Sequence, residues 1–314
     1  MKKHYLLSLL AIIMMILFST GCQSADQKAA AVKSSKTVET VKPYTVKDDR
    51  GKEITFKKVP KKVISLQPSN TEILFSLGVG DKIVGVTDFD NYPKEAASIE
   101  RVSDSVNVNA ERIIELKPDA VIAYTIGDEN ALKPLEDAGI PVFVIRSATT
   151  FEDVYGDIQQ ISEVMGVKDK GVKLVQDIQA QVDKVKGKIK GMKQPARMYF
   201  EISPAPDIYT TGKNTFQQEI LKTAGVENVF SKQEGWVKVT EEDVINQNPE
   251  IIVTTVNTSN DLVAEIKKRK GWGTLEAIKN NKVYQLDSDV LSRPGPRIGE
   301  AVELLAKTAY PEQF

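Results

Sequence analysis

The sequence predicts an α/β protein of two lobes joined by a single long helix, and three observations support this fold class. Short β-branched runs alternate with helical patterns in both halves of the chain, the two halves repeat one another, and an unbroken amphipathic segment separates them. Strands that alternate with helices are typical of crossover units around a mostly parallel sheet.

Short apolar runs give the clearest signal in the sequence and predict the strands. In the first half, runs bounded by proline, glycine or charge predict strands at residues 63–66, 83–86, 120–123 and 142–145. Helical patterns lie between them at residues 71–77, 110–117 and 130–138. The second half predicts strands at residues 198–202, 251–254 and 282–286 and a final helix near residues 298–308.

The segment between the two halves has a different pattern. Apolar residues recur there at spacings of three and four: Val172, Val175, Ile178, Val182, Val185 and Ile189. Gln, Asp and Lys fill most other positions, and neither proline nor glycine interrupts residues 172–186. One apolar stripe of this kind predicts a long helix that buries a single face and joins the lobes as a stiff strut.

The two halves also repeat short motifs in the same order. Residues 72–79 (EILFSLGV) are similar to residues 219–226 (EILKTAGV), and each predicts a short helix ended by glycine. Residues 109–119 and 240–250 each combine an N-capping residue, a helix and a Pro-acid pair that opens a strand. Chance similarity among short α/β segments is the alternative. The shared order favours two Rossmann-like lobes of related topology, with a crevice between them as the favoured ligand site.

The N-terminus predicts export. Lys2 and Lys3 precede an apolar run at residues 5–18, which is too short to span a bilayer comfortably, and small residues follow it. This order is typical of a secretory signal peptide. Residues 18–22 (FSTGC) resemble the lipobox of bacterial lipoproteins, in which the cysteine is acylated, although Ser19 stands where leucine is usual. The alternatives are cleavage elsewhere or an uncleaved anchor.

These signals divide the chain into five segments. We expect a signal peptide at 1–21, a lipid-anchor tether and lead-in at 22–60, an N-terminal lobe at 61–166, an interlobe helix at 167–190 and a C-terminal lobe at 191–314. Residues 23–42 lack aromatic side chains and cannot bury enough apolar surface to offset the entropy of ordering. The tether would hold the lobes on the extracytoplasmic face of the cell membrane through Cys22, the only cysteine.

Composition excludes several function classes. Removing the first 21 of 314 residues leaves 293, enough for two lobes, with 40 basic and 43 acidic residues once Lys2 and Lys3 are gone. The acidic balance argues against nucleic-acid binding. The only histidine, His4, lies in the signal peptide, so the mature chain lacks Ser-His-Asp chemistry and histidine-based zinc sites. We therefore predict no catalytic residues, no metal site and no cofactor, although carboxylate or lysine chemistry and a ligand-free scaffold remain alternatives.

Several motifs together resemble one family. They are VISLQPSNTE at 63–72, NAERI at 109–113, LKPD at 116–119, TGKN at 211–214, GVEN at 225–228 and RPGPRI at 293–298. From Val63 to the C-terminus the chain is similar to the substrate-binding proteins of cobalamin and iron-siderophore ABC importers. The resemblance implies two lobes bridged by one helix with small opening motions. It also implies a monomer that captures a metal-chelate ligand for a permease dimer with a cytoplasmic ATPase.

The resemblance assigns a docking role to two glutamates. In the family, one glutamate on each lobe pairs with arginines of the permease, and Glu111 and Glu242 match those positions. Exposed carboxylates would set register and steer encounter. The alternative is favourable interaction with a helix dipole, because both residues lie in a first helical turn.

The resemblance also places ligand contacts in the crevice. Phe89, Tyr124 and Trp236 match positions where cobalamin-binding members carry aromatic side chains, which give apolar contact with a flat macrocycle. Asp289 and Arg293 lie in segment 287–298. Arg293 precedes Pro-Gly-Pro, which predicts a loop, and a guanidinium there could bond to corrin amides or a siderophore carboxylate. Core packing of the aromatics and capping of the last helix by the arginine are the alternatives.

Two departures leave the ligand open. Ser105 and the pair Val290-Leu291 stand where cobalamin binders carry more aromatic residues, and no cluster of three basic residues suits a catecholate siderophore. Cobalamin is the first expectation, a neutral or weakly charged ferric siderophore the second, and haem the third because only tyrosine could ligate its iron.

Overall fold

The structure is a computed structural model that describes residues 42–104, 107–125, 130–257 and 261–314. Residues from Val41 to Phe314 form one compact unit. The predicted signal peptide, most of the tether, Cys22 and Ser105 lie outside the described residues. No described helix is both long enough and apolar enough to cross a lipid bilayer.

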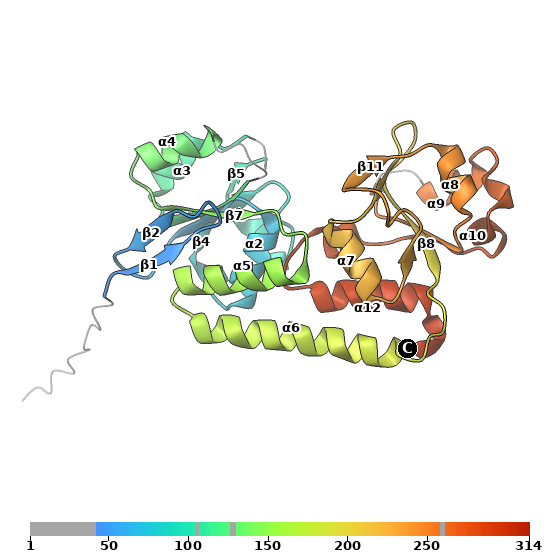
Figure 1. The fold of residues 1–314 in the computed structure, drawn as a ribbon. Coiled ribbons are helices and arrows are strands. Elements are labelled where there is room, and N and C mark those ends of the chain that lie inside the picture. Colours follow the sequence, from blue (N-terminus) through green and yellow to red (C-terminus); the bar gives the residue numbers. More distant parts are fainter. Residues whose placement is uncertain (1–41, 105–106, 126–129, 258–260) are drawn as a thin grey trace, which may run out of the picture. The chain divides into compact units, whose positions relative to one another are not determined.

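The N-terminal lobe is built on a parallel five-stranded sheet in the order β5-β4-β3-β6-β7 (Figure 1). Its strands are β3 (Val63–Ser65), β4 (Ile83–Thr87), β5 (Arg101–Ser103), β6 (Ala120–Thr125) and β7 (Val142–Arg146). Helices α2 (Pro68–Ser76) and α5 (Phe151–Val164) cover one face of the sheet, and α3 (Ala110–Leu116) and α4 (Lys133–Asp137) cover the other. Short 3-10 turns follow at Gly80–Lys82, Lys94–Ser98 and Asn130–Leu132. All four predicted strands are present, and β5 was not predicted.

One predicted boundary is wrong. The lead-in assigned to residues 22–60 contains an antiparallel hairpin, β1 (Tyr44–Lys47) and β2 (Glu53–Phe56), that belongs to the N-terminal lobe. Its alternate residues Val46, Ile54 and Phe56 are buried in the lobe core. The Tyr44 hydroxyl donates to the Val164 carbonyl at 2.6 Å. Burial raises the pKa of that hydroxyl to about 12. Two four-residue strands with Thr, Lys and Glu on the outward face give too little apolar signal to be recognised.

The C-terminal lobe has a mixed sheet in the order β11-β9-β8-β12-β13, with β10 on β8. The strands are β8 (Arg197–Ser203), β9 (Tyr209–Thr211), β10 (Glu227–Asn228), β11 (Trp236–Lys238), β12 (Ile251–Thr254) and β13 (Val283–Gln285). The helices are α7 (Phe216–Thr223), α8 (Glu241–Gln247), α9 (Leu262–Lys268), α10 (Glu276–Lys279), α11 (Ser288–Ser292) and α12 (Ile298–Ala309), with 3-10 turns at Trp272–Thr274 and Pro311–Gln313. Strands β8, β12 and β13 are parallel, and the antiparallel β9 and β11 form one edge.

The repeated motifs occupy equivalent places. Gly78 after α2 and Gly225 after α7 both adopt left-handed φ angles, of 68° and 71°. In each case the next residue donates back into the helix at 3.0 Å, from Val79 to Leu74 and from Val226 to Leu221. This is the helix-ending geometry that favours glycine. The second motif likewise joins α3 to β6 and α8 to β12, which confirms the predicted correspondence between the lobes.

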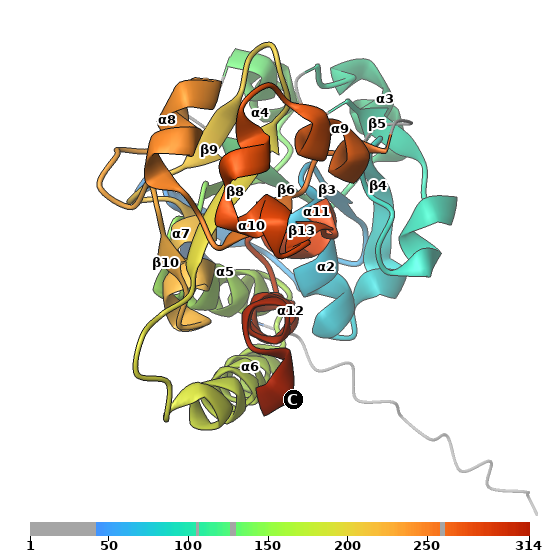
Figure 2. The same cartoon turned by 90° about the vertical axis from the view of Figure 1, so that its right-hand side faces the viewer.

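Helix α6 (Lys168–Ile189) connects the lobes, as predicted (Figures 1 and 2). Val175, Ile178, Val182 and Val185 bury the predicted face, whereas Val172 is 44% exposed and does not belong to it. The helix packs against α5 and α12. One hydrophobic core contains residues of the hairpin, α2, α5, α6, α7, β8, β12 and α12, so a single packed core joins the two lobes. The fold class is therefore the predicted one, two α/β lobes bridged by one long helix.

Candidate ligand-binding site

The two lobes are held together by a buried carboxylate between two arginines. Glu72 of α2 is 1% exposed. The Arg297 guanidinium donates to both of its oxygens at 2.8 and 2.7 Å, and Arg293 Nη1 donates at 3.0 Å. Burial disfavours the charge of Arg297, but the hydrogen bonds and attraction of Glu72 outweigh it and raise the pKa of the guanidinium. The junction is thus fixed by charge-assisted hydrogen bonds away from bulk water.

The loop after β4 is fastened to this junction. Arg293 Nη2 donates to the Phe89 carbonyl, and Nη1 donates to Asn91 Oδ1, both at 2.9 Å. Arg101 supports the loop from the other side by donating to the carbonyls of Thr87 and Asp90 at 2.7 and 2.8 Å. The backbone of Phe89 is therefore held in place, yet its ring is 58% exposed. The loop therefore offers a pre-positioned aromatic side chain, which would make a contact at little ordering cost.

The second lobe displays an aromatic residue in a similar way. Trp236 opens the edge strand β11 and is 55% exposed, and its indole Nε1 donates to Gln217 Oε1 at 3.2 Å. Beside it the Gly212 N–H donates to the Gly235 carbonyl at 2.8 Å. A Cβ atom on Gly212 would lie 2.4 Å from the Gln233 carbonyl oxygen, so only glycine fits this approach. The adjacent Phe216 meets Phe151 of the N-terminal lobe with ring centroids 5.9 Å apart.

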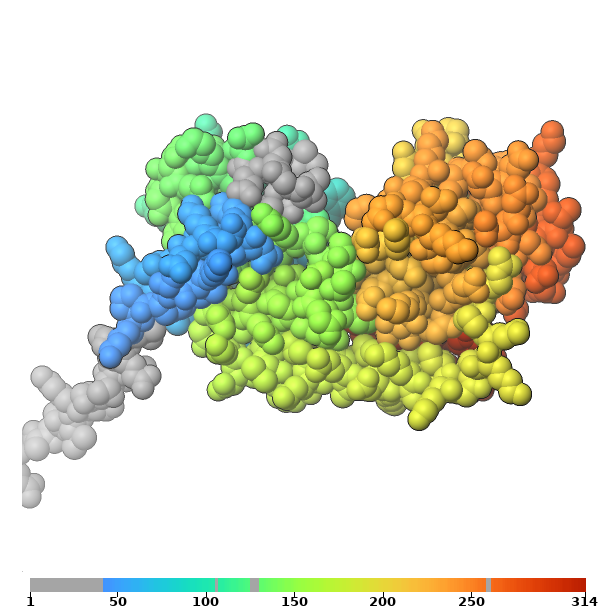
Figure 3. Space-filling model, viewed as in Figure 1, coloured from blue at the N-terminus to red at the C-terminus, as the bar shows by residue number. Residues whose placement is uncertain are grey.

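The predicted ligand residues thus gather around the lobe junction to different degrees. Asp289 of α11 accepts from Arg293 at 2.9 Å and from Asn91 Nδ2 at 2.7 Å, so Phe89, Asp289 and Arg293 form one hydrogen-bonded group. Tyr124 is half-buried near the carboxyl end of β6, in register with Ile145, and contacts none of this group through a hydrogen bond. Val290 and Leu291 are buried in the shared core, so their lack of aromatic character does not alter the exposed surface. Figure 3 shows a notch between the surfaces of the two lobes at the end away from α6.

Three residues of this region were not predicted: Glu72, Asn91 and Tyr92. The Tyr92 ring is 46% exposed, and the Arg297 guanidinium lies 4.3 Å from its centroid. Glu72 belongs to both a repeat and a family motif in the sequence, and its counterpart in the second repeat is the half-exposed Glu219. A carboxylate on the apolar helix that opens the first repeat was a usable signal, because buried acids need partners.

The two predicted docking residues occupy equivalent positions. Glu111 and Glu242 are each the second residue of their helix, α3 and α8, after the N-caps Asn109 and Thr240. Both side chains are exposed, and within the described part of the chain neither makes a hydrogen bond or an ion pair. By contrast, the neighbouring Arg112 is paired with Glu100 and Glu115. Two free carboxylates, one per lobe, are therefore available to a partner.

The polar side chains described at the lobe junction are not arranged as the ligands of a metal ion. Among the described residues, no three acidic, cysteine or histidine side chains are placed to hold a metal ion. The arginines of the junction are occupied by Glu72 and Asp289. The chemistry available on the exposed surface is thus aromatic contact together with hydrogen bonding.

Comparison with known proteins agrees with this geometry. The periplasmic binding protein family matches residues 63–290. An uncharacterized ABC transporter substrate-binding lipoprotein, YvrC of Bacillus subtilis, is 40% identical over 310 residues, which are 97% of this chain and 96% of that protein. A vitamin B12-binding protein of Vibrio parahaemolyticus is 34% identical over 246 residues, covering 77% of this chain and 86% of the relative.

A solved structure gives the same result. A possible iron-binding, periplasmic solute-binding protein of Staphylococcus epidermidis is 35% identical, with a TM-score of 0.73 over 81% of this chain and all of that one. These comparisons confirm the resemblance expected from the motifs. The chain therefore belongs to the periplasmic binding protein family, whose members are solute-binding components of transport and not enzymes.

Proposed function

We propose that this protein captures a small ligand in the notch between its lobes and delivers it to the permease of an ABC importer. The observation that carries the proposal is the pair Phe89 and Trp236, 58% and 55% exposed, one on each lobe. Each is displayed from a segment fixed by hydrogen bonds, Phe89 by Arg293 and Trp236 by Gln217. Two fixed aromatic faces can cover opposite sides of a ligand with little ordering cost.

Cobalamin is the ligand that this surface fits best. Its corrin ring is large and flat, and its amide side chains would suit the hydrogen-bonding groups beside Phe89. The arginines there are already paired with Glu72 and Asp289, so they offer little charge to a strongly anionic chelate. The vitamin B12-binding relative supports the same ligand.

A ferric siderophore of low charge is the second candidate, supported by the staphylococcal neighbour described as possibly iron-binding. Haem is the third candidate. Its iron would need a tyrosine ligand, and the candidates are Tyr92, three residues after Phe89, and the predicted ligand residue Tyr124. Titration calorimetry of the unit from Val41 to Phe314 with cyanocobalamin, then with neutral and anionic ferric siderophores, separates these ligands. Binding of cyanocobalamin supports the proposal. If only a siderophore binds, the proposed role in an importer stands, and the ligand is a siderophore and not cobalamin. No binding of any chelate contradicts both.

The unpaired carboxylates supply the docking surface. We propose that Glu111 and Glu242 meet arginines on the two halves of a permease dimer, whose cytoplasmic ATPase drives transport. Their matching positions in the two repeats support contact with a two-fold partner, and a monomer suits that stoichiometry.

Membrane attachment through an acylated Cys22, after removal of residues 1–21, is proposed from the sequence and supported by the lipoprotein name of the Bacillus relative. The Cys22→Ser variant should leave the membrane fraction and appear in the medium or periplasm. Retention of the variant in membranes would instead indicate an uncleaved N-terminal helix.

A further inference from the structure

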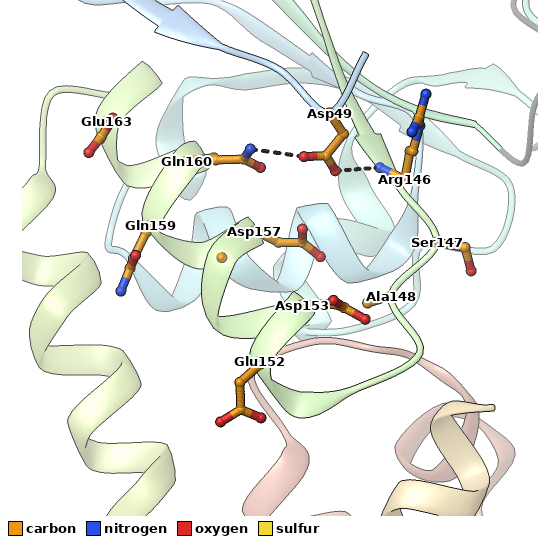
Figure 4. A pocket seen from close by; sticks show the side chains of 11 residues that line it. Asp49, Arg146, Ser147, Ala148, Glu152, Asp153, Asp157, Gln159, Gln160 and Glu163 are labelled. Carbon is orange, nitrogen blue, oxygen red and sulfur yellow. Dashed lines mark hydrogen bonds between the residues drawn. The ribbon is translucent and has the colours of Figure 1, made fainter. Parts of the chain in front are cut away.

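A second pocket lies wholly within the N-terminal lobe. It is bounded by the turn between β1 and β2, the end of β7 and one side of α5, and its volume is about 620 Å³ (Figure 4). Its lining residues include neither Phe89 nor Trp236, the two residues proposed above to hold the transported ligand. Its rim residues Arg146, Glu152 and Gln159 are exposed, whereas Asp157 in its floor is 7% exposed, so the pocket opens to solvent above a buried floor.

Asp157 is the unusual member of this pocket. Figure 4 shows its carboxylate reaching from α5 into the space between Asp49 and Asp153. No hydrogen bond or ion pair satisfies it anywhere in the described parts of the chain. A buried carboxylate without a partner is costly, and such a group normally has a counter-charge.

A neighbouring acceptor is also unsatisfied. Gln160 donates its amide Nε2 to Asp49 at 2.9 Å, which leaves the amide oxygen buried without a hydrogen bond. Asp49 also accepts from the Arg146 backbone at 2.8 Å. Asp49 is thus satisfied by two donors, whereas the Asp157 carboxylate and the Gln160 amide oxygen have no donor among the described residues.

The surrounding charges do not neutralise Asp157. The charged residues that line the pocket with it are acidic except one: Asp49 from the hairpin turn, Glu152, Asp153 and Glu163 from α5, and Arg146 from β7. The Arg146 guanidinium points away from Asp157 (Figure 4). Arg50 of the same turn is bound to Asp48 and Glu136, and Glu72 of the adjacent α2 is bound to the junction arginines. Burial, and then repulsion by Asp49 and Asp153, raises the pKa of Asp157 to about 8.

We propose that this pocket binds a small organic cation through an ammonium group, with Asp157 and Asp49 as counter-charges. An ammonium group supplies the donors that the Asp157 carboxylate lacks. A bare metal ion is a poorer fit, because no three carboxylates in the described residues converge on one point and the volume far exceeds one ion. The chemical class of ligand is thus an amine of a few carbons, such as a diamine.

Titration calorimetry of the unit from Val41 to Phe314 at pH 7 tests the assignment, since this unit contains its own cores. The probe is 1,5-diaminopentane, and 1,5-pentanediol is its uncharged analogue. We expect saturable binding of the diamine and none of the diol. Because free Asp157 is mostly protonated at pH 7, binding should release close to one proton, seen as different heats in phosphate and Tris buffers.

Two variants locate the site. Asp157→Asn should weaken diamine binding at least tenfold and abolish proton release, whereas Asp177→Asn, the same change on the exposed face of α6, should alter neither. Gly156→Leu should block the pocket without unfolding the helix, because a Cβ there meets no atom within 4 Å. Equal binding by all variants, equal binding of the diol, or binding of Ca²⁺ in place of the diamine would overturn the proposal. Proton release by the unaltered protein tests it even if a variant fails to fold.

Discussion

Glu72 and Arg297 form a two-point ion pair that joins the lobes, with donor–acceptor distances of 2.8 and 2.7 Å and 1% exposure of the glutamate. The same carboxylate accepts from Arg293 at 3.0 Å, so one buried acid balances two arginines. Because Arg293 also holds the carbonyl of Phe89, the network that fixes the lobes also fixes the proposed ligand surface.

The first prediction concerns this network. Glu72→Gln leaves the Arg297 guanidinium without its ion-pair partner and Arg293 with Asp289 alone, which should lower the free energy of unfolding by about 3–5 kcal/mol. The repeat-related Glu219→Gln is a matched control, because Glu219 is half-exposed and makes no ion pair within the described residues. Urea unfolding followed by circular dichroism measures both. Equal losses for the two variants would mean that the ion pair contributes nothing particular to stability.

The aromatic surface gives the second prediction. Trp236→Ala should weaken ligand binding by about 2 kcal/mol, roughly thirtyfold, because truncation removes one wall of the site. Stability should change by no more than about 0.5 kcal/mol, since the side chain is 55% exposed. Phe89→Ala should behave in the same way.

Intrinsic fluorescence measures this effect directly, because the chain has two tryptophans of opposite environment. Trp236 is exposed and Trp272 is fully buried, so a ligand that covers Trp236 should quench the red-shifted part of the emission. The Trp272→Phe variant should keep that quenching and Trp236→Phe should lose it. Quenching that survives in Trp236→Phe would place the ligand elsewhere.

The sequence predicted the helices and strands of the two lobes better than the contacts between the lobes. The stripe in 172–189 determined α6 almost to its ends, because a long amphipathic helix carries its own periodic signal. The hairpin at 44–56 was missed, because four-residue strands carry little pattern. Arg293 was recognised as a candidate, but its partner Glu72 lies 221 positions earlier, and only the folded topology brings them together.

Exposure could not be predicted from residue type either. In the sequence, Phe89 and Trp236 follow a strand and a loop, where aromatic residues of a core are also found. Only the fold shows that these two side chains are exposed and that the predicted ligand-region residues Val290 and Leu291 are buried. Asp157 illustrates the opposite case. Its position on α5 fits an ordinary polar face, yet the folded chain buries it to 7% exposure.

The third prediction tests docking. The double change Glu111→Lys and Glu242→Lys should reduce cellular uptake at least about tenfold while the dissociation constant for ligand stays within about twofold, because the exposed carboxylates contact a partner and not the ligand. Glu276→Lys is the control, since Glu276 is also an exposed acid in a first helical turn but has no repeat-related counterpart among the proposed docking residues. Loss of affinity in parallel with uptake would show that the glutamates act through the ligand site.

The last prediction is a pH dependence of stability at Asp157. Its pKa rises on folding from an ordinary 3.8 to about 8, so the folded state binds the proton more tightly than the unfolded chain. The resulting penalty is absent below pH 4, grows as the pH rises, and is complete above pH 8, because stability falls wherever the native state binds more protons.

Asp157→Asn removes the penalty. The variant should therefore match the unaltered protein in stability near pH 4 and exceed it increasingly toward pH 8. The upper bound on the difference is about 6 kcal/mol, from 1.36 kcal/mol per pH unit, and solvent at the pocket rim will reduce it. Chemical unfolding at pH 4, 6 and 8 measures the difference, with Asp177→Asn as the matched control. A constant difference across these pH values would mean that folding leaves the pKa of Asp157 unchanged. Saturating 1,5-diaminopentane should shrink the difference at pH 8, because a bound ammonium group would supply the counter-charge that the chain itself lacks.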